Sequence, residues 1–164
     1  MLSVRRILPQ NLDLFKTVRL HALQDSPSAF GSTYQREVNF SDEEWRARID
    51  RWNGETGVGF LAMDHDVLAE SGGALVDPAD RNRAELVSIW TAPMHRRKGV
   101  ASLLVNAVIG WMRSHDVSAL VLMVTSTNQP AIRFYARLGF RMTGRTESYP
   151  NDPAITELEM VCSI

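Results

Sequence analysis

The sequence has a single cysteine, Cys162, among its 164 residues. One cysteine excludes an intrachain disulfide and a thiol-rich zinc site. The four histidines are scattered, and none stands at the H-x-x-x-H or H-E-x-x-H spacing of a zinc enzyme, so we expect no metal. A chain that uses no disulfides is typical of a reducing compartment, and we therefore expect a cytoplasmic location.

Long apolar runs and an excess of one charge are also absent. No segment has the length of a membrane span, and the opening residues MLSVRRILPQ lack the apolar core of a signal peptide. A net charge of −1 argues against a nucleic-acid partner or an anionic membrane surface. With 45% hydrophobic and 23% charged residues, the composition is that of a globular protein, and we expect one domain, 1–164.

Hydrophobic periodicity predicts strands and helices in alternation. The expected strands are 3–8, the two halves of a hairpin over 57–76, 84–92, 118–125 and two strands within 141–163; the expected helices are 10–24, 41–52, 100–115 and 130–140. The helix between strands 84–92 and 118–125 implies that these two strands are parallel. The sequence therefore predicts a mixed sheet with helices packed on it.

The segment PMHRRKGVASLL places three cations between a strand and an apolar helix. The first turn of a helix has amide groups without intrahelical partners, and its dipole favours an anion such as phosphate. Gly99 lets the backbone approach an anion closely, and Ala101 keeps the first turn free of bulk. The alternative is a solvated charged turn. The segment contains no phosphate-binding motif of the form G-x-x-x-x-G-K-[ST].

Two blocks together resemble the GNAT superfamily of N-acetyltransferases. IWTAPMHRRKGVASLL resembles the coenzyme-A loop of that family, whose motif is Gln/Arg-x-x-Gly-x-Gly/Ala, and TSTNQPAIRFYARLGF resembles its second signature. The resemblance covers nearly the whole chain. It implies an α/β (α+β) single-domain fold with a mixed, mostly antiparallel sheet of about seven strands and about four helices on both faces.

The resemblance also implies which residues bind the acetyl-CoA cosubstrate. Ile89, Trp90 and Thr91 would offer main-chain groups to the pantetheine arm, and Asn128 would contact the coenzyme. The pyrophosphate would lie on the turn before the apolar helix, made of Arg96, Arg97, Lys98, Gly99, Val100, Ala101 and Ser102.

Acetyl transfer to an amine needs a base for the amine and an acid for the departing thiolate. Tyr135 matches the family's acid, although a helix tyrosine can also be a core residue with a satisfied hydroxyl. Glu85 matches a catalytic glutamate of several relatives, with a solvated strand carboxylate as the alternative. Other relatives carry a glutamate at the position of Met123. A water chain, an amine that arrives neutral and, more distantly, Glu70 remain alternatives to Glu85.

These residues predict an N-acetyltransferase that moves an acetyl group from the coenzyme thioester to a primary amine by direct attack in a ternary complex. The expected acceptor is a small-molecule amine or a protein or peptide amine, with no nucleic acid or membrane partner, and a homodimer is expected as in many relatives. No dense acidic stretch indicates a polyamine or basic-peptide acceptor. The alternative function is a non-catalytic acyl-CoA-binding or regulatory domain of the same fold.

Overall fold

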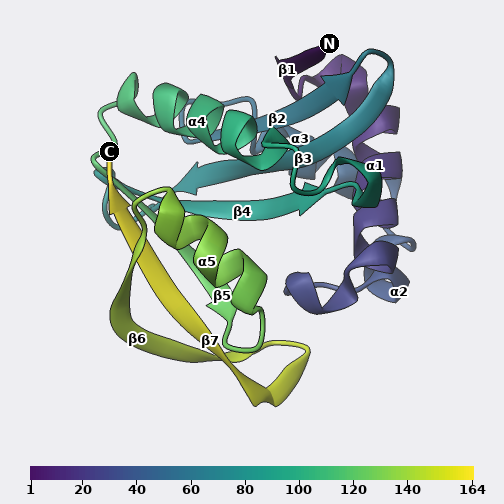
Figure 1. Ribbon diagram of the computed structural model, residues 1–164. Coiled ribbons are helices and arrows are strands. Elements are labelled where there is room, and N and C mark those ends of the chain that lie inside the picture. Colours follow the sequence, from purple (N-terminus) through teal and green to yellow (C-terminus); the bar gives the residue numbers. More distant parts are fainter.

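The computed structural model describes residues 1–164 and contains one seven-stranded sheet (Figure 1). Its strands are β1 (Leu2–Arg6), β2 (Gly57–Asp64), β3 (Val67–Val76), β4 (Arg83–Thr91), β5 (Ala119–Thr125), β6 (Arg141–Tyr149) and β7 (Asp152–Ser163). Its α-helices are α1 (Leu12–Asp25), α2 (Tyr34–Glu37), α3 (Asp42–Asp50), α4 (Val100–Arg113) and α5 (Gln129–Arg137).

The sheet is mixed, as the sequence pattern predicts, and mostly antiparallel, as the family resemblance implies. Its strand order is β1-β2-β3-β4-β5-β7-β6, and β4 and β5 form the one parallel pair. The predicted crossover through α4 is therefore confirmed. The structure adds α2, a four-residue helix that Thr33 caps by accepting a hydrogen bond from the Arg36 amide at 3.2 Å. A helix this short shows too little periodicity to be recognised in the sequence.

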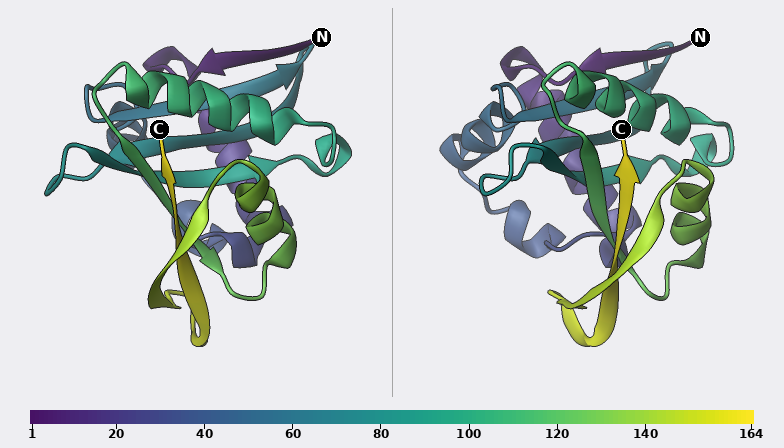
Figure 2. Two further views of the ribbon diagram at one scale, coloured as in Figure 1. Left: turned by 60° about the vertical axis from the view of Figure 1, so that its left-hand side comes forward. Right: turned by 90° about the vertical axis from the view of Figure 1, so that its left-hand side faces the viewer.

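Helices cover both faces of the sheet (Figure 2). The apolar side of α4 lies on one face, where Val100, Leu104, Val105, Val108 and Met112 are buried together with Tyr135 of α5. A second core on the opposite face holds α1 and α3 against the sheet. No helix is long and apolar enough to cross a membrane.

The beginning of α3 has the capping box that its sequence indicates. The Ser41 hydroxyl accepts from the Glu44 amide at 3.2 Å, and the Glu44 carboxylate accepts from the Ser41 amide at 2.7 Å. These bonds satisfy two amides at the helix terminus. Trp45 and Ile49, one turn apart, then face the second core and are buried.

Strands β4 and β5 pair over a short distance and then separate. Arg83–Glu85 pair with Ala119–Val121, whereas β4 continues to Thr91 without β5 as a neighbour. Ser88 has a positive φ of 60°, next to a register shift between β3 and β4, so β4 carries a bulge that bends it. Figure 1 shows the two arrows pointing apart. The separation leaves one side of β4 unpaired from Leu86 onward, and we call this region the opening.

Candidate active site

The turn before α4 has an unusual backbone. After the 3-10 turn Pro93–His95 (η3), Arg97 and Gly99 both have positive φ, of 64° and 78°. Gly99 is the residue that precedes the helix, and a Cβ placed on it would meet no atom within 4 Å. A glycine is thus favoured here by the left-handed backbone and not by crowding, and open space lies in front of it.

Six consecutive amides in this turn are free. No amide of residues 97–102 donates to a backbone carbonyl or to a side chain. Arg97 and Lys98 are exposed, and neither side chain forms an ion pair with a carboxylate of the chain. Free amides, the positive end of a fourteen-residue helix and two unpaired cations make this turn suited to a phosphate or pyrophosphate group.

Arg96 differs from its two neighbours because its side chain turns toward the protein. Its guanidinium forms an ion pair with Asp25 at the end of α1, and its Nε donates to the Thr91 carbonyl at 3.1 Å. The Trp90 indole N–H donates to the same Asp25 oxygen at 2.8 Å. Burial acts to raise the pKa of Asp25, but hydrogen bonds from Trp90 and Ser26 and the charge of Arg96 hold it below its usual value.

Residues 89–91 lie along the opening. The Trp90 side chain is buried in the second core, so only its main chain can contact a ligand there. Ile89 and Thr91, on either side of it, are partly buried. This placement is compatible with the main-chain role that the sequence predicts for the three residues.

Tyr135 has an enclosed ring and an unsatisfied hydroxyl. The ring packs edge-on against Phe134 and Phe140, with centroid distances of 5.1 and 5.6 Å. The residue is 9% exposed, and its hydroxyl neither makes a hydrogen bond within the protein nor belongs to the fully enclosed polar atoms. Burial, and then the charge of Glu70, raise the pKa of the phenol, so it stays protonated at neutral pH.

Asn128 lies between the end of β5 and the start of α5. Its side-chain oxygen accepts a hydrogen bond from the Ala131 amide at 3.3 Å and so caps α5. The side-chain NH2 group has no partner within the protein. Asn128 therefore keeps two donors for a ligand while its carbonyl holds the helix.

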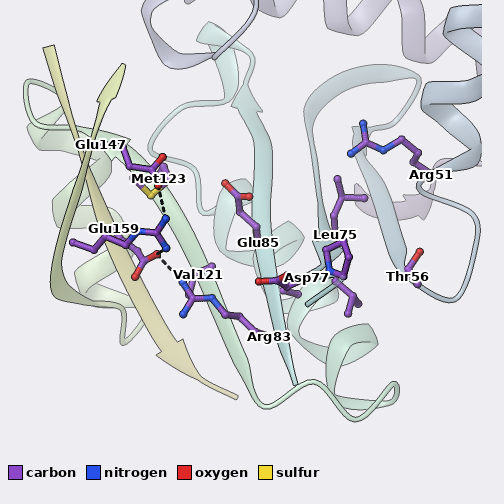
Figure 3. Close-up of a pocket in the computed structure, with 14 residues that line it drawn as sticks. Arg51, Thr56, Leu75, Asp77, Arg83, Glu85, Val121, Met123, Glu147 and Glu159 are labelled. Carbon is purple, nitrogen blue, oxygen red and sulfur yellow. Dashed lines mark hydrogen bonds and ion pairs between the residues drawn. The ribbon is translucent and has the colours of Figure 1, made fainter. Parts of the chain in front are cut away.

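Glu85 stands where the opening begins, on the face of the sheet opposite Tyr135. It is the last residue of β4 that pairs with β5, opposite Val121, and it lines a cavity of about 490 Å³ between α3 and the β6–β7 hairpin (Figure 3). Although Glu85 as a whole is exposed, the partial loss of water around its carboxyl group, and then the charge of Glu147, raise the pKa of Glu85, whereas Arg83 lowers it. Met123 also lines this cavity.

The cavity carries more carboxylates than the sequence indicates. Asp77, Glu85, Glu147 and Glu159 line it together, although they come from four separate segments. Two ion pairs, Arg83–Glu159 and Arg145–Glu147, are each 2.6 Å long, whereas Glu85 has no ion-pair partner. No stretch of the sequence is densely acidic, since only the sheet brings these residues together. The alternation of Glu157 and Glu159 along β7 is the one local signal of an acidic face.

The predicted site residues thus fall into two groups. The turn before α4, Tyr135 and Glu70 lie on the α4 side of the sheet, whereas Glu85 lies on the α1–α3 side, and the opening between β4 and β5 joins the two sides.

Comparisons with known proteins agree with this geometry. The sequence model of the Acetyltransferase (GNAT) family matches residues 20–140. The N-alpha-acetyltransferase 60 of Drosophila melanogaster is 32% identical over 96 residues, covering 57% of this chain and 33% of that protein. The streptothricin acetyltransferase of Streptomyces lavendulae is 33% identical over 85 residues, covering 52% of this chain and 45% of that protein. The chain thus spans less than half the length of these curated relatives.

Solved structures extend the likeness of the fold to almost all residues. A GNAT-family acetyltransferase of Streptococcus pneumoniae superposes with a TM-score of 0.82 at 21% identity, covering 100% of this chain and 99% of that one. The structure of yncA from Salmonella typhimurium, solved with acetyl-CoA, has a TM-score of 0.78 at 15% identity and covers 99% of this chain and 93% of that one. On the match of its sequence to the family model, the chain belongs to the Acetyltransferase (GNAT) family.

Proposed function

We propose that this protein transfers an acetyl group from acetyl-CoA to a primary amine. The observation that carries the proposal is the run of six free amides at residues 97–102, which stands beside the opening between β4 and β5. Tyr135 borders the same side of the sheet with a free hydroxyl. This combination provides an anion site, a channel edged by unpaired main chain and a proton donor.

The chain's residues fit the coenzyme in three places. The amides of 97–102, with Arg97 and Lys98, suit the pyrophosphate. The unpaired edge of β4 at 89–91 suits the amides of the pantetheine arm, which can add to a strand edge by main-chain hydrogen bonds. The side-chain NH2 group of Asn128 adds a donor at the start of α5. Arg96 supports the turn from behind through Asp25.

In the proposed reaction, Glu85 on one side of the opening acts as the base and Tyr135 on the other side acts as the acid. The acceptor amine attacks the thioester carbonyl, a C–N bond forms, and the C–S bond breaks. Glu85, with its raised pKa, accepts the proton that the amine loses, directly or through water. Tyr135 donates its proton to the departing thiolate. No covalent intermediate is needed, because the two substrates are held together at one opening.

The cavity beside Glu85 supports an amine as acceptor. The cavity opens on the side of the sheet opposite the turn of residues 97–102. Acetyl-CoA and the acceptor amine would therefore enter from different faces of the sheet. Four carboxylates and three arginines line the cavity, and Glu85, at the opening, forms no ion pair with any of these arginines, so its carboxylate is available to an ammonium group. Both small amines and the amines of peptides fit this description.

A panel of amines tests the activity directly. Free thiol is measured as it is released from acetyl-CoA in the presence of small amines, diamines and short peptides with free amino groups. We expect release above the rate of spontaneous hydrolysis with at least one class of acceptor, and its loss when the acceptor is acetylated beforehand. Saturable coenzyme binding without thiol release for any acceptor would instead support the acyl-CoA-binding domain.

We also propose a cytoplasmic location and a homodimer. The single, partly buried cysteine suits a reducing compartment, and β6 is an exposed edge strand available for pairing with a second copy. Light scattering of the purified protein tests the dimer, and a monomer mass at micromolar concentration would contradict it.

A further inference from the structure

Glu70 is a buried carboxyl group without a partner. It lies on β3 with 0% of its surface exposed, and neither carboxyl oxygen has a hydrogen bond. The other two buried carboxylates are satisfied: Glu37 pairs with Arg19 and Arg48, and Glu159 accepts hydrogen bonds from Arg83 and Thr143. Glu70 is therefore an exception among the acidic residues of the interior.

The sheet places Glu70 next to the end of β4, which leads into the turn of residues 97–102. Its register partners are Ala62 on β2 and Thr91 on β4. Because residues that face each other in an antiparallel pair point to the same side, and Ala62 belongs to the core under α4, Glu70 points to the α4 side of the sheet. Thr91 is the last residue of β4 and directly precedes the turn that leads to α4.

Glu70 also acts electrostatically on Tyr135, the proposed proton donor to the thiolate. The charge of Glu70 contributes to the raised pKa of Tyr135, so the two side chains lie within electrostatic range of each other. Glu70 thus lies opposite the last residue of β4 before the turn with free amides, along the part of β4 that has no β5 neighbour.

A buried carboxyl with no partner lowers the stability of the folded protein, because water is lost and nothing replaces it. A leucine or methionine of similar volume would fill the same space without this cost. Groups of this kind are commonly found where a ligand completes the hydrogen bonds. The pantetheine arm of coenzyme A has two amides and a hydroxyl, which offer both donors and acceptors.

We propose that Glu70 is a coenzyme-binding residue whose carboxyl group, enclosed in the free protein, turns into the opening when the coenzyme binds and hydrogen-bonds the pantetheine arm between the turn of residues 97–102 and the thioester. The inference rests on the proposed acetyl-CoA site and adds to it a side-chain contact from β3.

The protonation state of Glu70 determines which hydrogen bonds it can make. Burial raises the pKa of Glu70 to about 8, so at pH 7 the group is mostly neutral; the Thr91 hydroxyl is near enough to lower this pKa in part but makes no hydrogen bond with either carboxyl oxygen. The groups that face it are the phenol of Tyr135 on α5, the Thr91 hydroxyl on β4 and the apolar Ala62 on β2. A neutral carboxyl has one O–H donor and one carbonyl acceptor, and it matches an amide of the arm.

Two substitutions and two ligands test this role. Coenzyme A binding and thermal unfolding are measured at pH 7 for the parent, Glu70→Gln and Glu70→Leu, with Met63→Leu as a control for repacking on the other face of the sheet. We expect Glu70→Leu to melt at a higher temperature than the parent and to bind coenzyme A about tenfold more weakly. Glu70→Gln keeps one donor and one acceptor, so its affinity should stay within about threefold of the parent.

The nucleotide half of coenzyme A, which keeps the pyrophosphate and lacks the pantetheine arm, is the matched ligand. Its affinity should be the same for the parent, both Glu70 variants and Met63→Leu, because Glu70 contacts only the arm. Equal coenzyme A affinity in the parent and Glu70→Leu, or an equal loss for Leu and Gln, would overturn the inference. A parent that binds neither ligand would overturn the proposed coenzyme site itself.

An infrared difference spectrum covers the case in which Glu70→Leu does not fold. Coenzyme A addition to the parent should shift the C=O stretching band of a protonated carboxyl, and the shift should be missing in Glu70→Gln. A spectrum without such a band in a parent that binds coenzyme A would show that Glu70 makes no contact with it.

Discussion

The phenol of Tyr135 is held at its ring and free at its hydroxyl. Phe134 and Phe140 fix the ring, while no protein group accepts or donates at the oxygen. A core tyrosine usually finds a partner for its hydroxyl. The free hydroxyl therefore supports the role of proton donor over that of a packing residue.

Substitution of Tyr135 by phenylalanine should separate these roles. Tyr135→Phe keeps the ring contacts and removes the acid, so we expect kcat to fall about a hundredfold while the affinity for acetyl-CoA and the free energy of unfolding stay near the parent values. Thiol release under saturating acetyl-CoA measures kcat. An unchanged kcat would remove Tyr135 from the mechanism.

The carboxylate of Glu85 should control the acid limb of the pH profile. A base acts only when it is deprotonated, so activity should fall as the pH drops through the raised pKa of Glu85. We expect Glu85→Gln to lose activity together with this limb. The variant Glu147→Gln removes a neighbouring negative charge, which lowers the pKa of Glu85 and should move the limb to lower pH. A Glu85→Gln profile that coincides with the parent would exclude Glu85 as the base.

Tyr135 and Glu85 are candidates that the sequence indicates, but their surroundings could not be predicted from it. The motif and the strand position indicate both residues. The free hydroxyl of one and the unpaired carboxylate of the other depend on contacts between distant segments. Glu70 shows the limit most clearly, because only the register of β3 with β4 places it opposite Thr91.

The turn between β4 and α4 combines a strained backbone with free amides. Gly99 at a φ of 78° sets the direction in which the amides point, and the cations act from its periphery. The backbone should therefore matter more for coenzyme binding than any single charge.

Substitutions that disturb the backbone of this turn should therefore weaken coenzyme binding more than the loss of one cation. Gly99→Glu puts a side chain on a left-handed backbone and a negative charge before the free amides, so we expect coenzyme A binding to be lost. Lys98→Ala should weaken binding only about threefold. Gly99→Asn is the matched control, because asparagine tolerates a positive φ and adds no charge, and it should bind better than Gly99→Glu. Near-parent affinity in Gly99→Glu, measured by calorimetry, would leave this stretch a solvated turn.

Asp25 connects α1 with the same turn. Asp25→Asn removes the ion pair with Arg96 while its side-chain oxygen can still accept from the Trp90 indole. We expect KM for acetyl-CoA to rise about threefold to tenfold with kcat unchanged, and stability to fall by about 1 kcal/mol. Asp13→Asn, on an exposed turn of α1 without an ion pair, is the control. A KM for Asp25→Asn equal to that of the control would exclude the positioning role.

Most elements could be predicted because each carries its own periodic pattern. The α4 stripe, the α3 capping box and the apolar β5 are local signals. The bulge at Ser88 that separates β4 from β5 has no such signal, since serine is not a typical left-handed residue. The opening, which defines the site, therefore appears only in the structure.

At the scale of the whole molecule, the opening between β4 and β5 can be reached from both faces of the sheet. The turn of residues 97–102, Tyr135 and Glu70 lie on the α4 side, and the acidic cavity with Glu85 lies on the α1–α3 side. This arrangement supports the proposed acyl transfer within a ternary complex, because a donor and an acceptor bound in this way would not compete for the same entrance.

A crystal structure of the protein with coenzyme A tests this arrangement most directly. We predict the pyrophosphate on the amides of residues 97–102, the pantetheine arm along β4 at 89–91 and the sulfur between Tyr135 and Glu85. Coenzyme bound elsewhere, or with its sulfur directed away from the opening between β4 and β5, would contradict the account.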